Sequence, residues 1–252
     1  MKPLTVLGCR LDPIDAEEAA ARILALAAGG TAAQVVTLGT EMVVHAQHDA
    51  RFRAIVNGSA LSLCDTVGLL AVARRRGAPL RDRVAGVELI DRLCAGAAAA
   101  ALPVYFLGGA NGVAADAAAA LRGRHAGLRV AGARSGFFSG EEIAAVVRDI
   151  ASSGARLLFV GLGSPRQEYW LAEHLRATGC GAGIGIGGSL DVIAGRIARA
   201  PQLARNLRIE WLYRLIKEPR RWRRQLALPR FVWLMLLDEL GFYRARKSTA
   251  GS

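Results

Sequence analysis

The stretch Leu61-Ser62-Leu63-Cys64-Asp65-Thr66-Val67-Gly68-Leu69-Leu70 decides the fold class of this chain. Residues 61–64 are apolar and short, as in a buried strand, whereas residues 67–76 repeat apolar side chains at helical spacing before Gly77, a residue type common just after a helix. Asp65 is therefore predicted to lie at the carboxyl end of a strand, just before a helix. Open α/β sheets bind ligands at this edge. Aspartate also caps helices, so position alone leaves both roles open for Asp65.

Strand-like and helix-like segments alternate through most of the chain, with short turns between them. Six further segments have the length and apolar content of strands, and they begin near residues 5, 34, 104, 128, 156 and 183. Asp15 and Glu18 have the spacing of a capping box at the start of the first helix. This alternation predicts an α/β fold with a Rossmann-like, largely parallel, doubly wound sheet.

Basic residues gather at the C-terminal end of the chain. Residues 1–195 carry 19 Lys and Arg against 17 Asp and Glu, whereas residues 196–252 carry 14 against 4, which is +10 of the net charge of +12. We therefore expect an α/β domain over 1–195 and a basic helical appendage over 196–252. Such an appendage suits anionic lipid, phosphate ligands or nucleic acid. The apolar run 231–237 is too short to span a bilayer; it suits a membrane interface or packing on the chain itself.

The cysteines and histidines argue against a disulfide framework and a metal site. The four cysteines are far apart and form no CxxC pair, which predicts buried thiols in a reducing compartment; they are Cys9, Cys64, Cys94 and Cys180. His45 and His48 lie three residues apart but lack a third ligand in sequence, so we expect no metal there. The N-terminus has no apolar run of signal-peptide length, so we expect a cytoplasmic protein.

Glycines follow several predicted strands. Gly108 and Gly109 follow one strand, Gly136 follows another beside Phe137, and Gly163 follows a third. Glycine lets a backbone approach a diphosphate closely, with helix-start amides pointing at it. The pattern is neither GxGxxG nor a P-loop, so tight turns explain it as well. Phe137 suits stacking on a nucleotide base and packing in the core equally.

Five blocks, taken together and in order, resemble the WecG/TagA/CpsF family of bacterial glycosyltransferases (glycosyltransferase family 26). The resemblance covers nearly the whole chain, from about residue 4 to 226, and the last two blocks are the most distinctive. The blocks are residues 37–42 (TLGTEM), 64–68 (CDTVG), 83–86 (RVAG), 161–168 (GLGSPRQE), and 199–221, which includes EWLYRL and EPRR.

The resemblance implies an inverting, metal-independent hexosyltransferase with a GT-E-like fold and no cofactor. Such enzymes move a sugar, often N-acetylmannosamine, from a UDP-sugar to an undecaprenyl-diphosphate-linked amino sugar in cell-wall or exopolysaccharide synthesis. It also implies a cytoplasmic protein held peripherally on the inner face of the cell membrane. A homo-oligomer is possible, and nucleic acid is not an expected partner.

The family's site residues fall on identifiable positions of this chain. Its proposed general base matches Asp65, and other active-site positions match Thr37, Arg83 and Gln167. Its C-terminal arginines match a set made up of Arg214, Arg221 and Arg224. The family often has Asn where this chain has Gly39, and we expect Thr40 or Glu41 to substitute.

A UDP site is expected at the glycine-bearing strand ends. Phe137 would stack on uracil, and Asp191 would accept the imide N–H of the base. The full set is Gly108, Gly109, Gly136, Phe137, Gly163 and Asp191.

The chemistry also follows from the residues. Inverting transfer needs one carboxylate to take the acceptor proton and positive charge on the departing diphosphate. The chain contains no DxD triplet, so arginines would supply that charge through bidentate contacts. A dinucleotide-dependent oxidoreductase is disfavoured because GxGxxG does not follow the first strand. A nucleic-acid-binding protein is disfavoured because aromatic residues do not alternate with basic residues in the domain 1–195. The basic appendage 196–252, taken alone, leaves nucleic-acid binding open as an alternative.

Overall fold

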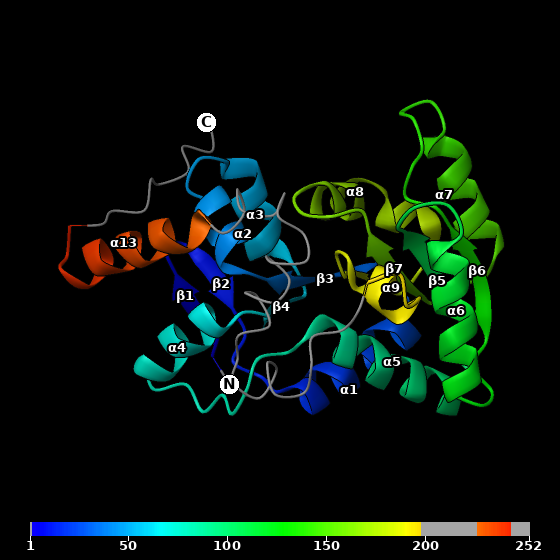
Figure 1. The fold of residues 1–252 in the computed structure, drawn as a ribbon, viewed down its shortest axis with the longest axis horizontal. Coiled ribbons are helices and arrows are strands. Elements are labelled where there is room, and N and C mark those ends of the chain that lie inside the picture. Colours follow the sequence, from blue (N-terminus) through cyan, green and yellow to red (C-terminus); the bar gives the residue numbers. More distant parts are fainter. Residues whose placement is uncertain (1, 198–225, 243–252) are drawn as a thin grey trace.

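The computed structural model describes residues 2–197 and 226–242 (Figure 1). Its centre is a parallel sheet with the strand order β4-β3-β8-β7-β5-β6. The strands are β3 (Ala33–Leu38), β4 (Leu61–Cys64), β5 (Val104–Gly108), β6 (Val130–Arg134), β7 (Leu157–Gly161) and β8 (Ala182–Gly185). The predicted α/β class and parallel sheet are therefore confirmed.

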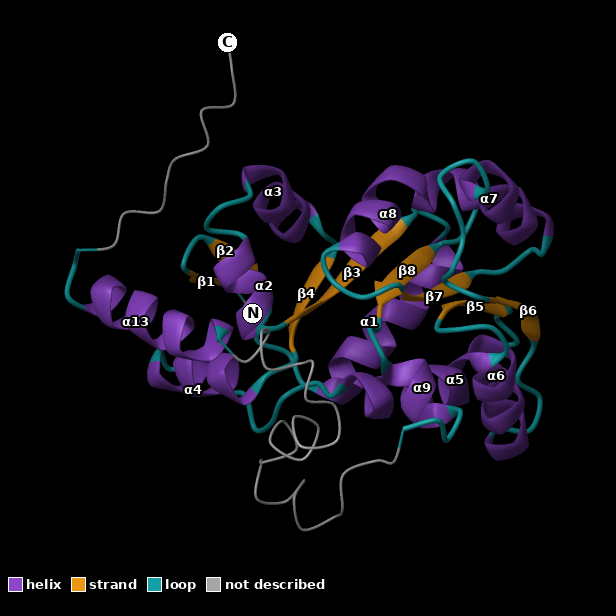
Figure 2. Cartoon of the chain, turned by 45° about the horizontal axis from the view of Figure 1, so that its top comes forward, coloured by secondary structure: helices purple, strands orange, loops and turns teal. Residues whose placement is uncertain are grey.

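Helices cover both faces of this sheet (Figure 2). They do so because successive side chains of each strand point to opposite faces, and both sets are apolar. Phe106 and Phe159 belong to the core on one face, and their rings stack 5.0 Å apart. The helices of that face are α1 (Ala16–Gly29), α5 (Gly86–Ala99), α6 (Val113–Arg124) and α9 (Ser189–Ile193). The other face packs against α7 (Ile143–Ser152), α8 (Arg166–His174) and the 3₁₀ helix η1 (Leu175–Thr178).

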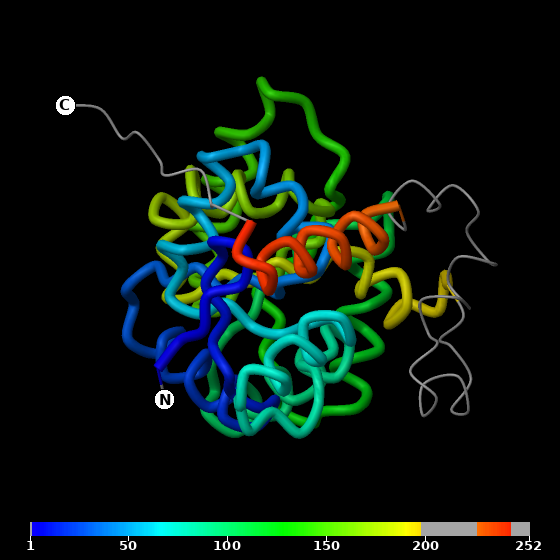
Figure 3. The backbone as a smooth tube through the Cα atoms, turned by 90° about the vertical axis from the view of Figure 1, so that its left-hand side faces the viewer, coloured from blue at the N-terminus to red at the C-terminus, as the bar shows by residue number. Residues whose placement is uncertain are grey.

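A further core lies at the β4 side of the molecule and joins the two ends of the chain. It contains the antiparallel hairpin of β1 (Leu4–Val6) and β2 (Cys9–Leu11), together with α2 (Thr40–His45), α3 (Ala50–Gly58), α4 (Val67–Arg75) and α13 (Ala227–Glu239). Figure 3 shows α13, in orange to red, beside the blue hairpin and the cyan α4. Phe231 and Met235 of α13 are buried in this core, and Arg76 pairs with Asp238 at 2.6 Å.

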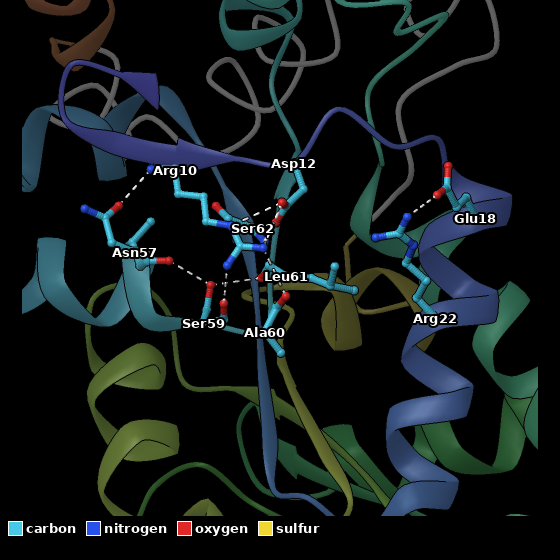
Figure 4. Close-up of polar contacts among 10 residues, drawn as sticks. Arg10, Asp12, Glu18, Arg22, Asn57, Ser59, Ala60, Leu61 and Ser62 are labelled. Carbon is cyan, nitrogen blue, oxygen red and sulfur yellow. Dashed lines mark hydrogen bonds and ion pairs between the residues drawn. The ribbon is translucent and has the colours of Figure 1, made fainter. Parts of the chain in front are cut away.

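The hairpin is fixed to the outer edge of β4 by a buried aspartate (Figure 4). The Asp12 amide donates to the Ser62 carbonyl at 2.8 Å, and the Ser62 amide donates to Asp12 Oδ2 at 2.7 Å. Arg10 Nη2 donates to Asp12 Oδ1 at 2.9 Å and Arg10 Nη1 to the Ser59 carbonyl at 2.9 Å. These bonds satisfy backbone groups that an open edge strand would leave unpaired.

The strand–turn–helix unit around Asp65 agrees with its prediction. The strand β4 ends at Cys64, α4 begins at Val67, and Gly77 follows the helix with φ +79°. Thr66 takes the N-cap position of α4, so the interpretation of Asp65 as the cap is wrong.

The capping box at α1 is only half formed. The Asp15 side chain accepts hydrogen bonds from the amides of Glu17 and Glu18, as predicted. The Glu18 carboxylate instead accepts a hydrogen bond from Arg22, one turn further along the helix, at 2.5 Å.

All four cysteines are buried and free, as predicted. Burial raises the pKa of the thiols of Cys9, Cys64 and Cys94 to about 12, so they are unreactive near neutral pH. In the described ranges no helix has the length and apolar content to cross a membrane. Arg214, Arg221 and Arg224 lie outside the described residues, and the proposed domain boundary at 195/196 stays a prediction.

Candidate active site

The carboxyl ends of the six parallel strands all lie at one edge of the sheet, so their loops form a continuous row. This edge of an open α/β sheet is where ligands bind. In sheet order, the first residues beyond the strands are Asp65, Gly39, Ile186, Leu162, Gly109 and Ser135. Residues far apart in sequence, such as Asp65 and Gln167, therefore belong to the same edge.

Asp65 occupies the end of this row with Arg83 beside it. The Asp65 amide continues the β3 pairing by donating to the Leu38 carbonyl at 3.0 Å. The Val84 amide donates to the Cys64 carbonyl at 2.6 Å, which holds the Arg83 loop against the strand end. Arg83 Nη1 donates to the Asp65 carbonyl at 3.3 Å and lies 3.9 Å from its carboxylate. The Asp65 side chain is 34% exposed, so its carboxylate remains accessible to a ligand.

Thr37 and Thr40 lie on either side of the β3 end. Thr37 is buried, and its hydroxyl donates to the Gly185 carbonyl at 2.8 Å, which ties β3 to β8. Thr40 begins α2, and its methyl group lies against Gly68, where a Cβ would come within 2.8 Å of it. Thr40 thus borders the Asp65 loop, whereas Thr37 lies beneath the row. A substrate-binding role for either stays a prediction.

Gln167 and Glu168 form a buried pair at the start of α8. Gln167 Nε2 donates to Glu168 Oε1 at 2.7 Å, and the Gly187 amide donates to Gln167 Oε1 at 2.9 Å. Burial, with a smaller contribution from the charge of Glu41, raises the pKa of the Glu168 carboxyl. The sequence reasoning included Gln167 but missed Glu168.

Four glycines bring neighbouring loops of the row together, backbone to backbone. We call Gly136, Gly108, Gly161 and Gly187 the glycine row. A Cβ at Gly136 would come within 3.0 Å of Gly108 Cα, one at Gly108 within 2.6 Å of Gly161 Cα, and one at Gly161 within 2.8 Å of the Gly187 oxygen. At four of the six strand ends, backbone therefore packs on backbone with no side chain between.

The alternative interpretation, that glycines after the strands form tight turns, also holds for two glycines outside the glycine row. Gly109 has φ +68° and Gly163 has φ +77°, values that side-chain-bearing residues rarely adopt. Tight turns and close approach are thus compatible, and a diphosphate at this edge stays a prediction.

The loop after β6 separates two neighbouring phenylalanines. Phe137 is 78% exposed, so the alternative of packing in the core is wrong for it. Phe138 instead packs beneath the Arg166 guanidinium, 5.1 Å from its ring centroid. Asp191 lies in the first turn of α9, directly after the β8 loop. Contact of Phe137 or Asp191 with uracil stays a prediction.

The histidine pair has structural partners. His45 Nε2 lies 3.3 Å from Asp49, and His48 lies 2.6 Å from Arg230 of α13. Within residues 2–197 and 226–242, no three or more His, Cys, Asp or Glu side chains are grouped so as to hold a metal ion.

Comparison with known proteins shows the family of this chain. The model of the glycosyl transferase WecG/TagA/CpsF family matches residues 4–245. The chain belongs to this family. Since the members of this family are glycosyltransferases, this chain is a glycosyltransferase. One curated relative, from Bacillus spizizenii, is 32% identical over 205 residues, which are 81% of this chain and 79% of that protein. That relative is named N-acetylglucosaminyldiphosphoundecaprenol N-acetyl-beta-D-mannosaminyltransferase.

Proposed function

We propose that this glycosyltransferase moves N-acetylmannosamine, or a closely related N-acetylhexosamine, from a UDP-sugar to an undecaprenyl-diphosphate-linked amino sugar. The observation that carries the proposal is the one-third-exposed Asp65 carboxylate beside Arg83, at the same strand-end edge as the glycine row. The family match and the name of the Bacillus relative support the choice of donor and acceptor.

The proposed reaction is a single displacement with inversion. The Asp65 carboxylate takes the proton of the acceptor hydroxyl as that oxygen forms a bond to the anomeric carbon of the donor sugar. The bond between the anomeric carbon and the UDP oxygen breaks, and UDP leaves with its electron pair. Arg83 adds positive charge beside Asp65, with its guanidinium 3.9 Å from the carboxylate.

The donor is proposed to lie along the glycine row. Backbone without side chains permits the diphosphate to approach closely, and Phe137 is exposed at the end of the row for stacking on uracil. Base–aromatic stacking contributes about 1–3 kcal/mol. Phe137→Ala should therefore weaken UDP binding by roughly 5- to 100-fold in calorimetry, and Asp191→Ala should weaken it as well. Phe242→Ala is the matched control, because Phe242 is an equally exposed ring beyond α13. Unchanged UDP affinity in both site variants would move the donor elsewhere.

Basic residues of the tail are proposed to neutralise the departing diphosphate without a metal. The helix α13 reaches the candidate site, since Phe231 and Leu228 lie within 4 Å of a Cβ placed on Gly68, next to Thr40. Arg214, Arg221 and Arg224 precede it in the chain. Arg221→Ala should sharply reduce turnover yet leave vesicle binding nearly intact, since one basic residue contributes about 1 kcal/mol at an anionic membrane. Activity should persist in excess EDTA. If Arg221→Ala kept full turnover, the positive charge on the departing diphosphate would have to come from residues 1–195, and Arg83 would be the first candidate.

Membrane association is proposed to use the outer face of α13. One face of this helix is buried on the body, and the other leaves apolar side chains exposed: Val232, Trp233, Leu236 and Leu240. Both interpretations of the apolar run, packing on the body and facing a membrane, are thus compatible with α13. The double variant Trp233→Gln/Leu240→Gln should bind anionic vesicles more weakly in flotation, yet keep its activity on a water-soluble acceptor. Undiminished flotation would exclude this face as the membrane contact.

The deciding experiment is a product assay. The purified chain is incubated with individual UDP-sugars and a short-chain lipid-diphosphate N-acetylglucosamine acceptor, and the product mass identifies the transferred sugar. A mass increase of one N-acetylhexosamine with UDP-N-acetylmannosamine supports the proposal. Transfer from none of the UDP-sugars tested, with wild-type protein that is folded, would contradict it.

A further inference from the structure

Glu168 is a carboxyl group in the interior of the molecule. It is 1% exposed and lies on the buried side of α8, whose first turn follows the β7 end. Gly185, the last residue of β8, makes room for it: a Cβ there would come within 2.6 Å of Gln167 Nε2 and 3.1 Å of Glu168 Oε1. The backbone of Glu168 is tied to β3, because Gln34 Nε2 donates to its carbonyl at 3.0 Å.

The contacts of the neighbouring Gln167 have a defined direction. A carboxamide has a donor end and an acceptor end, and here the donor end faces the Glu168 carboxyl while the acceptor end receives the Gly187 amide. Exchanging the two ends would place an N–H against the Gly187 N–H, so the carboxyl of Glu168 selects one orientation of the amide. Gln167 is itself 3% exposed, so its main connection to the row is through Gly187.

The Gly187 turn lies between the two halves of the candidate site. On one side it meets the glycine row, where a Cβ at Gly161 would come within 2.8 Å of the Gly187 oxygen. On the other side Ser189 Oγ would lie 3.0 Å from a Cβ on Gly86, at the end of the Arg83 loop. A shift of this turn would therefore change the spacing between the glycine row and the Asp65–Arg83 pair.

We propose that Glu168 is a positioning residue, whose carboxyl orients the Gln167 carboxamide and thereby fixes the Gly187 turn between the glycine row and the Arg83 loop. The catalytic consequence rests on the proposed function, whereas the effect on the turn does not. Glu168 needs no contact with substrate for this role, in keeping with its burial.

The surroundings favour the uncharged form of this carboxyl, which can still accept the Gln167 N–H. Burial raises the pKa of Glu168 by more than its hydrogen bonds with Gln167 and Ser164 lower it. The titratable groups that face it add no positive charge: Glu41 from α2 and Tyr169 from its own helix. A neutral acid is much less costly to bury than a carboxylate. Glutamine, which is uncharged and retains a carbonyl acceptor, should therefore replace Glu168 with little loss, whereas an apolar residue should not.

The first test follows the turn directly. Hydrogen exchange is measured by mass spectrometry on peptides covering residues 185–190 in wild type, Glu168→Leu, Glu168→Gln and the control Gln34→Leu. Gln34→Leu removes the bond to the Glu168 backbone but leaves its carboxyl in place. We expect faster exchange of the turn only in Glu168→Leu. Exchange that stays at the wild-type rate in Glu168→Leu would overturn the proposal whether or not the chain transfers sugar. Glu168→Met repeats the comparison should leucine prevent folding.

The second test asks whether Glu168 acts through Gln167. Removing one partner of a buried hydrogen bond leaves the other unpaired, so Glu168→Leu should lower kcat/KM for the donor by roughly 10- to 100-fold. Glu168→Gln should stay within about 3-fold of wild type by the same argument, since the acceptor remains. In the Gln167→Ala background, Glu168→Leu should cause almost no further loss, because the shared partner is gone. Fully additive losses, or a Glu168→Gln enzyme as impaired as Glu168→Leu, would overturn the positioning role.

Discussion

Asp12 and Asp65 both meet the short strand β4, one at Ser62 and the other just past Cys64, yet the fold uses them in opposite ways. Asp12 is buried, and its carboxylate accepts hydrogen bonds from the Ser62 amide and from Arg10. Asp65 is about one-third exposed, with Arg83 at 3.9 Å, beyond hydrogen-bond length. The first aspartate closes an edge of the sheet, and the second faces the open end.

This difference separates stability from chemistry along one strand. A buried carboxylate with its hydrogen bonds made stabilises the fold and has no capacity left for a ligand. A carboxylate at a strand end that is one-third exposed lies where a substrate can approach it and give up a proton. We therefore expect substitutions at the two aspartates to affect different measured quantities.

The largest effect is expected at Asp65. Asp65→Asn removes the proton acceptor but keeps the shape of the side chain, so turnover should fall roughly 10²- to 10⁴-fold. The free energy of unfolding should change by less than about 0.5 kcal/mol, as is usual for exposed positions. Steady-state kinetics and urea unfolding measure the two quantities. Normal turnover in the folded Asn variant would remove Asp65 as the base.

Asp12→Ala should show the reverse. The change leaves the Ser62 amide and the Arg10 guanidinium without their shared partner, which should cost about 1–3 kcal/mol of unfolding free energy. Turnover per folded molecule should stay near wild type, because the Asp65 end of β4 keeps its bonds to Leu38 and Val84. A large loss of turnover with unchanged stability would break the comparison.

A smaller effect is expected from the two arginines. Arg83→Lys should lower kcat by about 10-fold, since a lysine provides one point charge in place of a planar fork, and should barely change the unfolding midpoint. Arg10→Lys should instead lower the midpoint, because Arg10 also bonds the carbonyls of Ser59 and Ala60. Equal kinetic losses in both variants would mean that the two arginines are not functionally distinct.

The smallest effect concerns pH. The folded-state pKa of Glu168 is raised above the ordinary value of 4.5, so its contribution to stability is complete below that value and is lost as pH rises through the raised pKa. The difference in unfolding free energy between wild type and Glu168→Gln should therefore shift against wild type as the pH rises from 4.5. Burial raises the pKa of the thiols of Cys9, Cys64 and Cys94 to about 12 and also raises that of Cys180, so the cysteines do not titrate in this pH range. A difference that is independent of pH would show that burial does not perturb this carboxyl.

The structure around Asp65 could be predicted well from the sequence, because local patterns decide it. Residues 61–64 are apolar and too short for a helix, and Gly77 marks the end of α4, so the strand, the helix and the place of Asp65 follow from neighbours in sequence. The buried cysteines follow from composition in the same way.

Long-range contacts could not be predicted in this way. The insertion of β8 between β3 and β7 depends on pairing with β3, which lies more than a hundred residues earlier in the chain, so the meeting of Thr37 with Gly185 has no local signal. The strand β2 was missed because the turn at Leu7 and Gly8, both with positive φ, looked like the end of a strand rather than the middle of a hairpin.

Glu168 had a signal that went unused. It lies three residues before Leu171 and seven before Leu175, so helical periodicity places it on the buried side of α8. A charged residue on the buried side of a predicted helix indicates either that the helix prediction is wrong or that the charged side chain has a structural or functional role. The helix α3 was missed for a related reason, since Arg53 is buried on what should be an apolar face.

The packing of α13 has a consequence for how the protein is made. Val6 and Leu11 share a core with Phe231 and Met235, which leave the ribosome more than two hundred residues later. The hairpin and α4 therefore wait, with part of their apolar surface uncovered, until α13 has been synthesised. A nascent chain halted before α13 would hold a nearly finished sheet beside an unfinished core, and Gly68, next to the Asp65 loop, would lie at the uncovered boundary.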